Sequence, residues 1–139
     1  MNAACSLIVA AELGSLAAVR DFVRESAAAL GIAPRVIPSL LLAMDEAATN
    51  IVEHGYCGRP GPLEIEMYRE GCDIVMRLCD QAPVFDPTTQ VAPPDLTAPL
   101  EERDLGHLGV YFMLQFMDEV VHRARPEGGN ELTMRKRVA

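Results

Sequence analysis

The sequence predicts an α+β domain of two layers, in which helices cover one face of a mostly antiparallel β-sheet. Two patterns carry this prediction. Apolar residues recur with the 3.6-residue period of an α-helix before residue 55, and with the two-residue period of a β-strand after residue 62. The expected order is one strand, two helices, two strands, a long loop, one helix and two strands.

Length, composition and charge limit the number of domains, the type of core and the partners to be expected. A chain of 139 residues suffices for one domain with a real core, so we expect a single domain over residues 1–139. Half of the residues are apolar and none is Trp, which predicts an aliphatic core. The 20 acidic residues exceed the 12 basic ones, and the formal net charge of −8 disfavours direct binding to nucleic acid.

Signals for export or membrane insertion are not found in the sequence. The first 13 residues lack a basic region, and Glu12 interrupts their apolar run, so no signal peptide is expected. No apolar stretch approaches the length of a membrane span. The four cysteines show no C-x-x-C spacing typical of zinc sites. We therefore expect a cytoplasmic protein with reduced thiols and no membrane partner.

The first third of the chain is expected to hold one strand and two helices. Residues 5–11 form a short apolar run, which fits a strand or the start of a buried helix. Residues 13–30 have apolar residues at helical spacing and end before Gly31, a common C-terminal signal. The second helix is expected over residues 40–54 and ends at Gly55.

The rest of the chain begins with a predicted β-hairpin, residues 63–79, which ends at Asp80. Residues 82–105 contain several prolines and show no period; a loop of this length is disordered or a functional lid, and we favour a lid. A helix is expected next, with buried positions at Val110, Phe112 or Met113, Phe116 and Met117. Two further strands, residues 119–125 and 131–138, close the sheet.

The helix over residues 40–54 carries the first candidate site. The apolar stripe expected to face the core consists of Leu40, Met44, Ala47 and Ile51. Glu46 and Asn50 are four residues apart, so their side chains stack on the flank of that stripe. Such a pair is most often a solvated helix face. The chemical alternative is that Asn50 offers an amide oxygen to Mg²⁺, while Glu46 orients or deprotonates a hydroxyl group.

Five motifs occur in a fixed order between Glu46 and Arg137, and the similarity described below covers the chain from about residue 10 to residue 137. They are E-x-x-x-N-x-x-x-H-G-Y from Glu46, D-x-A-x-x-F-D-P from Asp80, L-E-E-R-x-x-G-x-L-G from Leu100, M-D-E-V from Met117 and N-x-L-T-M-x-K-R from Asn130. Together they resemble the anti-sigma factor serine/threonine kinases of the RsbW and SpoIIAB type. These are small bacterial members of the ATPase superfamily that includes gyrase, heat-shock protein 90, histidine kinases and MutL.

The resemblance implies a Bergerat-type ATP-binding fold and a role for four residues. Glu46 would be the general base and Asn50 the Mg²⁺ ligand. Asp80 would accept a hydrogen bond from the adenine amino group, and Thr133 would lie beside the adenine. Without the resemblance, Asp80 could begin a turn and Thr133 is ordinary in a strand.

The resemblance also implies a phosphate-binding turn made by Gly106, Leu108 and Gly109, because free N–H groups at a helix N-terminus favour an anion. Both glycines could equally punctuate a loop. The chain departs from the family pattern at two nucleotide contacts. Ala82 and His107 stand where glycine is usual. The methyl group of Ala82 could be accommodated or could narrow the adenine pocket. His107 would be strained if its site needs a positive φ, but its imidazole could also add a donor near the phosphates.

The function that the resemblance implies is an ATP- and Mg²⁺-dependent protein kinase. Its substrate would be a Ser or Thr of an anti-sigma factor antagonist of the STAS type, which would compete with a sigma factor for this protein. Many relatives dimerise, so a homodimer is also implied. The alternatives are an adapter that keeps the fold but has lost turnover, motivated by Ala82 and His107, and a catalytic domain cut from a larger ATPase or histidine kinase.

Overall fold

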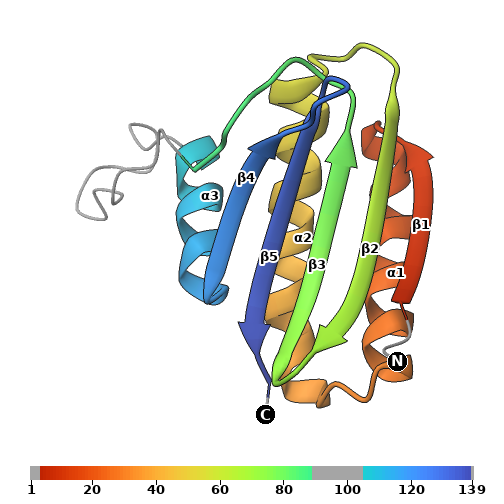
Figure 1. The fold of residues 1–139 in the computed structure, drawn as a ribbon, viewed down its shortest axis with the longest axis vertical. Helices are drawn as coiled ribbons and strands as arrows, with labels where there is room; N and C mark the ends of the chain where they lie inside the picture. Colours follow the sequence, from red (N-terminus) through yellow and green to blue (C-terminus); the bar gives the residue numbers. More distant parts are fainter. Residues whose placement is uncertain (1–3, 89–104, 139) are drawn as a thin grey trace.

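In a computed structural model, which describes residues 4–88 and 105–138, five antiparallel strands form one sheet in the order β1-β2-β3-β5-β4 (Figure 1). The strands are β1 (Ala4–Ala10), β2 (Pro62–Glu70), β3 (Asp73–Asp80), β4 (Glu119–Ala124) and β5 (Asn130–Arg137). The helices α1 (Leu16–Ala29), α2 (Ile37–Asn50) and α3 (Leu105–Phe116) lie on one face of the sheet. The predicted two-layer α+β fold is thereby confirmed.

Local sequence signals explain where these elements begin and end. The run at residues 5–11, which fitted a strand or a helix, forms β1 and pairs with β2. After α1 the chain turns at Gly31, whose φ of +73° suits glycine. Pro38 lies in the first turn of α2, where its missing N–H costs no helical hydrogen bond. Most of the predicted lid, residues 89–104, lies outside the described residues.

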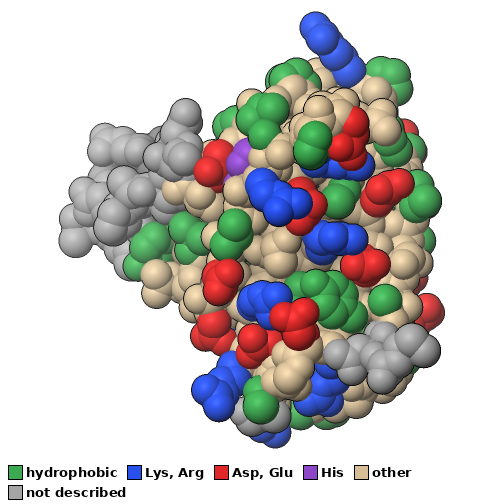
Figure 2. Space-filling model, viewed as in Figure 1, with side chains coloured by type: hydrophobic (Ala, Val, Ile, Leu, Met, Phe, Trp, Pro, Cys, Tyr) green, Lys and Arg blue, Asp and Glu red, His purple; other side chains and the backbone are tan. Residues whose placement is uncertain are grey.

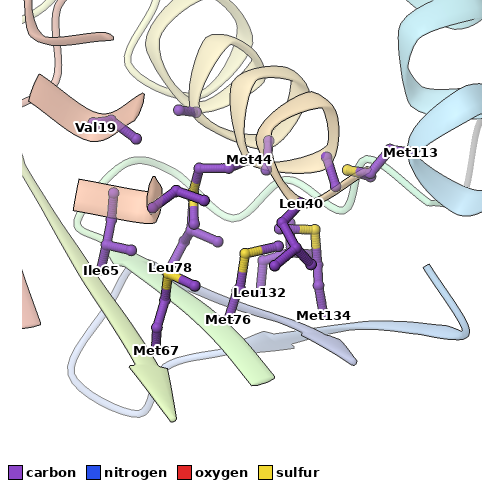
Figure 3. Packing of buried hydrophobic residues seen from close by; sticks show 14 of the residues in the cluster. Val19, Leu40, Met44, Ile65, Met67, Met76, Leu78, Met113, Leu132 and Met134 are labelled. Carbon is purple, nitrogen blue, oxygen red and sulfur yellow. The ribbon is translucent and has the colours of Figure 1, made fainter. Parts of the chain in front are cut away.

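The core lies between the sheet and the helices and is aliphatic, as predicted. In Figure 3, side chains from α2 meet side chains from β2, β3 and β5. The labelled core residues are Val19, Leu40, Met44, Ile65, Met67, Met76, Leu78, Met113, Leu132 and Met134. Each fully buried Leu, Ile or Met adds about 1.5–3 kcal/mol by leaving water. This packing fixes α2 against the centre of the sheet.

The opposite face of the sheet is open and charged, as Figure 2 shows. Its strands carry cross-strand ion pairs, which include Arg77 with Glu66 at 3.2 Å and Arg135 with Glu70 at 2.8 Å. Opposite charges on facing strands stabilise a sheet modestly. The alternation of apolar and charged residues in β2 therefore matches one buried face and one solvated face.

Helix α3 packs against α2 and extends the helical layer beyond the sheet edge at β4. Val110, Met113 and Met117 are buried, as expected. Phe116 was expected to be buried but is 40% exposed; it is the last residue of α3, where the helix ends. No helix within the described ranges is both long and apolar enough to cross a membrane.

Candidate functional site

Three of the four buried polar side chains in the described ranges line one pocket, at the end of the sheet where α2 finishes. They are Asn50, Asp80 and Asn130. The remaining walls are Ala47, Ile51, Gly55, Phe85, Pro87, His122 and Leu132. The pocket opens to solvent, and the 330 Å³ of space outside protein atoms within it includes part of that open solvent. Apolar walls with a few converging polar groups are typical of a small-molecule site.

Asn50 is the last residue of α2 and is buried in this pocket. Its Nδ2 atom finds no hydrogen-bond partner among the described residues. A buried polar atom without a partner costs about 1–3 kcal/mol, so its presence needs an explanation. Because a half-turn about χ2 exchanges the two ends of a carboxamide, this position can offer a donor to a phosphate or an oxygen to a cation.

The helix continues beyond Asn50 as a π-helical turn, Ile51–Gly55, in which the N–H of Tyr56 donates to the carbonyl of Ile51 at 2.8 Å. Single π-helical turns occur frequently at functional sites. The Tyr56 hydroxyl then donates to the carbonyl of Pro62 at 2.7 Å and accepts from the N–H of Gln81 at 2.8 Å. Burial raises the pKa of Tyr56, so it stays a neutral donor. Tyr56 thus joins the end of α2 to the end of β3.

Asp80 ends β3 with its carboxylate buried in the pocket. Its Oδ1 accepts hydrogen bonds from the N–H of Ala82 and from Nδ2 of Asn130, both at 2.9 Å. Strand register explains the second bond, because Asp80 and Asn130 face each other across β3 and β5. Both hydrogen bonds that the described residues donate to the Asp80 carboxylate end on Oδ1. Oδ2 therefore stays available to a donor on a ligand.

The sequence analysis missed two pocket residues, Asn130 and His122. Asn130 Oδ1 accepts from the N–H of Phe85 at 2.9 Å and lies 2.7 Å from His122 Nε2. Asn130 opens the N-x-L-T-M-x-K-R motif, but the role in that motif was assigned to Thr133, and His122 belonged to no motif. The signal that could have found Asn130 is its place at the start of the last strand, opposite Asp80 in a β3–β5 pair.

Glu46 lies one turn before Asn50 and is partly buried on α2. Burial, and then the neighbouring carboxylates of Asp45 and Glu53, raise the pKa of Glu46. A carboxylate with a raised pKa is a stronger proton acceptor while it remains ionised. Glu46 does not line the pocket of Asp80, so the two carboxylates have separate surroundings.

Ala82 does not line the Asp80 pocket either; it borders a second hollow on the other side of Gly55 and Tyr56. Its methyl group is buried beside Gly55, and a Cβ on Gly55 would lie 3.3 Å from it. The extra methyl therefore occupies space left by the glycine of the H-G-Y motif. Of the two outcomes considered for Ala82, this contact fits accommodation of the methyl group.

The glycine motif after the predicted lid begins a helix earlier than expected. Helix α3 starts at Leu105, so Gly106, His107, Leu108 and Gly109 all lie in its first turns. Within the described ranges, Cys57 is the one non-glycine residue with a positive φ. His107 therefore lies in α3 without the positive φ on which its strain was conditional.

Thr133 was expected beside the adenine, and the structure contradicts this. Its neighbours Leu132 and Met134 point into the core, so Thr133 faces the open side of the sheet, where it is paired with Arg77 and Val121. The pocket position on β5 belongs to Asn130, three residues earlier. Successive strand residues alternate between faces, so an odd offset places the side chain on the wrong face.

Comparison with known proteins agrees with this fold. The family model described as "Histidine kinase-like ATPase domain" matches residues 9–136. The chain belongs to this family. A structure of the RsbU and RsbW domains of Rv1364c from Mycobacterium tuberculosis has the same fold, with a TM-score of 0.61 and 18% identity over 96% of the chain. The chain spans about a third of the length of that protein, 32%.

Several curated relatives are similar over most of the chain. The serine/threonine-protein kinase BtrW of Bordetella bronchiseptica is 30% identical over 97 residues, which are 69% of this chain and 67% of the relative. An anti-sigma F factor of a Thermoanaerobacter species is 29% identical over 86% of this chain and 82% of the relative. The serine-protein kinase RsbW of Bacillus cereus is 30% identical over 66% of this chain and 59% of the relative. The predicted resemblance to the RsbW and SpoIIAB type is confirmed.

Proposed function

We propose that this chain is an anti-sigma factor kinase that binds ATP with Mg²⁺ and phosphorylates a Ser or Thr of an anti-sigma factor antagonist of the STAS type. The observation that carries the proposal is the convergence of Asn50 and Asp80 on one apolar pocket. Similar proteins named anti-sigma F factor and serine-protein kinase RsbW support the choice of reaction.

Asp80 would select adenine as the base of the nucleotide. An adenine amino group donates hydrogen bonds, and Oδ2 of Asp80 is available to accept one. The apolar walls of the pocket, which include Ile51 and Leu132, suit the faces of a purine ring. Phe85 and Pro87 close the side of the pocket from which the predicted lid continues.

Asn50 would hold Mg²⁺, and its unpartnered carboxamide fits this role. Within the described ranges no group of three His, Cys, Asp or Glu side chains could hold a metal, so the nucleotide phosphates would supply most of the other ligands. When bound, Mg²⁺-ATP supplies the γ-phosphoryl group and the positive charge that neutralises the phosphates. The free N–H groups in the first turn of α3, at Gly106 to Leu108, favour an anion.

Glu46 would act as the general base. It would accept the proton of the attacking Ser or Thr hydroxyl while that oxygen bonds to the γ-phosphorus and the bond from the γ-phosphorus to ADP breaks. The raised pKa of Glu46 makes its carboxylate a stronger proton acceptor. Because Glu46 does not line the Asp80 pocket, proton transfer would take place apart from the bound adenine. An unphosphorylated antagonist and a sigma factor would compete for the protein, and a homodimer is part of this proposal.

The first test is calorimetric titration of the purified protein with ATP and ADP, with and without Mg²⁺. Micromolar binding that strengthens with Mg²⁺ is expected. A second assay would incubate the protein with labelled ATP and a purified STAS-domain protein from the same genome, and would look for label on a Ser or Thr. Failure to bind ATP at millimolar concentration would contradict the proposal. ATP binding with no transfer to any such antagonist would support the adapter.

A further inference from the structure

His122 is a buried imidazole in the nucleotide pocket, and none of the roles discussed so far uses it. It lies on β4, its side chain is only 8% exposed, and it lines the pocket beside Asn130. Its Nε2 is 2.7 Å from Asn130 Oδ1, and its Nδ1 is 3.8 Å from Asp86 Oδ2. The ring therefore lies between Asp86, which follows β3, and Asn130, which begins β5.

The neighbours of His122 determine which ring nitrogen carries a hydrogen. Asn130 Oδ1 can only accept hydrogen bonds, and it already accepts the N–H of Phe85. The short contact with His122 is therefore a bond in which Nε2–H donates. On the other side of the carboxamide, Nδ2 donates to Asp80 Oδ1 at 2.9 Å and to the carbonyls of Pro83 and Ala82 at 3.1 and 3.4 Å. His122 is the one side chain that donates to Oδ1 among the described residues, and with the N–H of Phe85 it keeps Oδ1 turned away from Asp80.

This orientation decides what Asp80 presents to a ligand. Asn130 Nδ2 and the N–H of Ala82 occupy Oδ1, which leaves Oδ2 as an acceptor in an apolar pocket. A base with an amino group at the corresponding edge gains a hydrogen bond there. A base with a carbonyl oxygen at that edge meets a second acceptor, and an unpaired buried polar contact is costly.

We propose that His122 is a positioning residue for base selection: through Asn130 it holds Asp80 so that ATP is preferred over GTP. This inference rests on the proposed nucleotide-binding function. Asp86 contributes on the other side of the ring. Its Oδ1 accepts from the N–H and the hydroxyl of Thr88, at 2.8 and 2.6 Å, while Oδ2 faces His122 Nδ1.

The test compares three variants by calorimetric titration with Mg²⁺-ATP and Mg²⁺-GTP. His122→Leu keeps apolar bulk but removes the donor. It is expected to weaken ATP binding about tenfold and to lower the ratio of ATP to GTP affinity by at least as much. His122→Gln keeps an N–H donor at similar reach and is expected to restore the ratio to within about threefold. Val121→Ala, on the open face of the sheet next to His122, controls for a general change in β4.

An unchanged ratio in His122→Leu would overturn the inference while leaving the proposed function intact. If the unaltered protein bound neither nucleotide, the proposed function would fail and the inference with it. A further measurement does not depend on nucleotide or on variants. The ¹⁵N chemical shifts of the His122 ring in the labelled protein are expected to show a protonated Nε2, and a ring with hydrogen only on Nδ1 would overturn the inference.

Discussion

Ala82 and Gly55 fit together: a methyl group on Gly55 would lie 3.3 Å from the Ala82 Cβ, closer than most such contacts. The two residues belong to different motifs, one at the end of β3 and one in the turn after α2. Ala82 stands where glycine is usual in the family, and the missing side chain of Gly55 leaves room for the Ala82 methyl group. A departure from the family pattern is thus accommodated without narrowing the Asp80 pocket.

This contact predicts coupling between the two positions. Gly55→Ala is expected to lower the free energy of unfolding by about 1–3 kcal/mol, because the added methyl overpacks a buried site. In Gly55→Ala/Ala82→Gly the methyl moves to the other partner, and about 0.5–3 kcal/mol should return as coupling energy. Urea unfolding of both single variants and the double variant measures this.

Gly14→Ala provides the control, because a Cβ at Gly14 meets nothing within 4 Å and its φ is not positive. It should be neutral or stabilising by about 0.4–1 kcal/mol. Strictly additive effects of Gly55→Ala and Ala82→Gly would show that the methyl groups do not interact. Ala82→Gly alone is expected to leave the affinity for ATP unchanged, since Ala82 does not line the Asp80 pocket.

Asn50→Leu is expected to separate stability from ligand binding. Leucine has nearly the shape of asparagine and removes the unpartnered Nδ2, so the free protein should gain about 1–2 kcal/mol of unfolding free energy. The same change removes the proposed Mg²⁺ ligand and should weaken Mg²⁺-dependent ATP binding at least tenfold. Thermal unfolding and calorimetric titration measure the two effects.

Asn50→Asp is the matched comparison for Asn50→Leu. It keeps oxygen ligands for Mg²⁺, so it should retain Mg²⁺-dependent binding, but it buries a charge and should destabilise the free protein. If Asn50→Leu were less stable than the unaltered protein, Nδ2 would have a partner in solution. Equal ATP affinity in all three proteins would remove Asn50 from the metal site.

The fold and two of the pocket's polar residues, Asn50 and Asp80, could be predicted from the sequence, because the patterns that place them are local. The spacing of Glu46 and Asn50 follows from one helix, and the hairpin ending at Asp80 follows from a two-residue period. His122 and Asn130 reach the pocket only through the pairing of β4 with β5 and of β5 with β3. That register is set by packing across the sheet, so a motif that begins at Asn130 did not reveal which of its side chains faces the pocket, and no pattern marked His122.

Thr133 shows how sensitive a strand position is to register. It lies three residues from Asn130, which is close in sequence, yet it projects from the opposite face. The accommodation of Ala82 by Gly55 was likewise hidden, because it joins two separate turns. Contacts of this kind depend on how elements pack, and a single sequence does not specify that packing.

Glu46→Gln is expected to abolish phosphoryl transfer and yet stabilise the protein at neutral pH. Because the pKa of Glu46 is raised by burial and by Asp45 and Glu53, the folded protein binds this proton more tightly than the unfolded chain. Stability therefore falls as pH rises from the unfolded pKa through the raised folded pKa. Glutamine cannot ionise, so the variant should have the higher melting temperature at pH 7 and lose that advantage near pH 4.

Thermal unfolding between pH 4 and pH 8 checks this, with transfer measured in parallel. Glu25→Gln, at an exposed site on α1, gives the effect of removing one negative charge without burial. ATP affinity should be retained in Glu46→Gln, since Glu46 does not line the base pocket. A variant that still transfers phosphate would exclude Glu46 as the base, and a pH-independent gain in stability would exclude the proposed cause.

Gly129→Ala is expected to distort the Asp80 pocket by displacing the backbone at the end of β3. A Cβ on Gly129 would lie 2.0 Å from the carbonyl oxygen of Asp80, so the backbone before β5 must move away from the end of β3. Gly128→Ala is a matched control: its φ of +100° is close to the +99° of Gly129, but a Cβ there meets nothing within 4 Å. Both variants share the cost of a positive φ, about 1–2 kcal/mol. Gly129→Ala alone should also displace Asp80 and weaken ATP binding, so equal unfolding energies and ATP affinities in the two variants would show that the β3–β5 approach at Asp80 does not support the site.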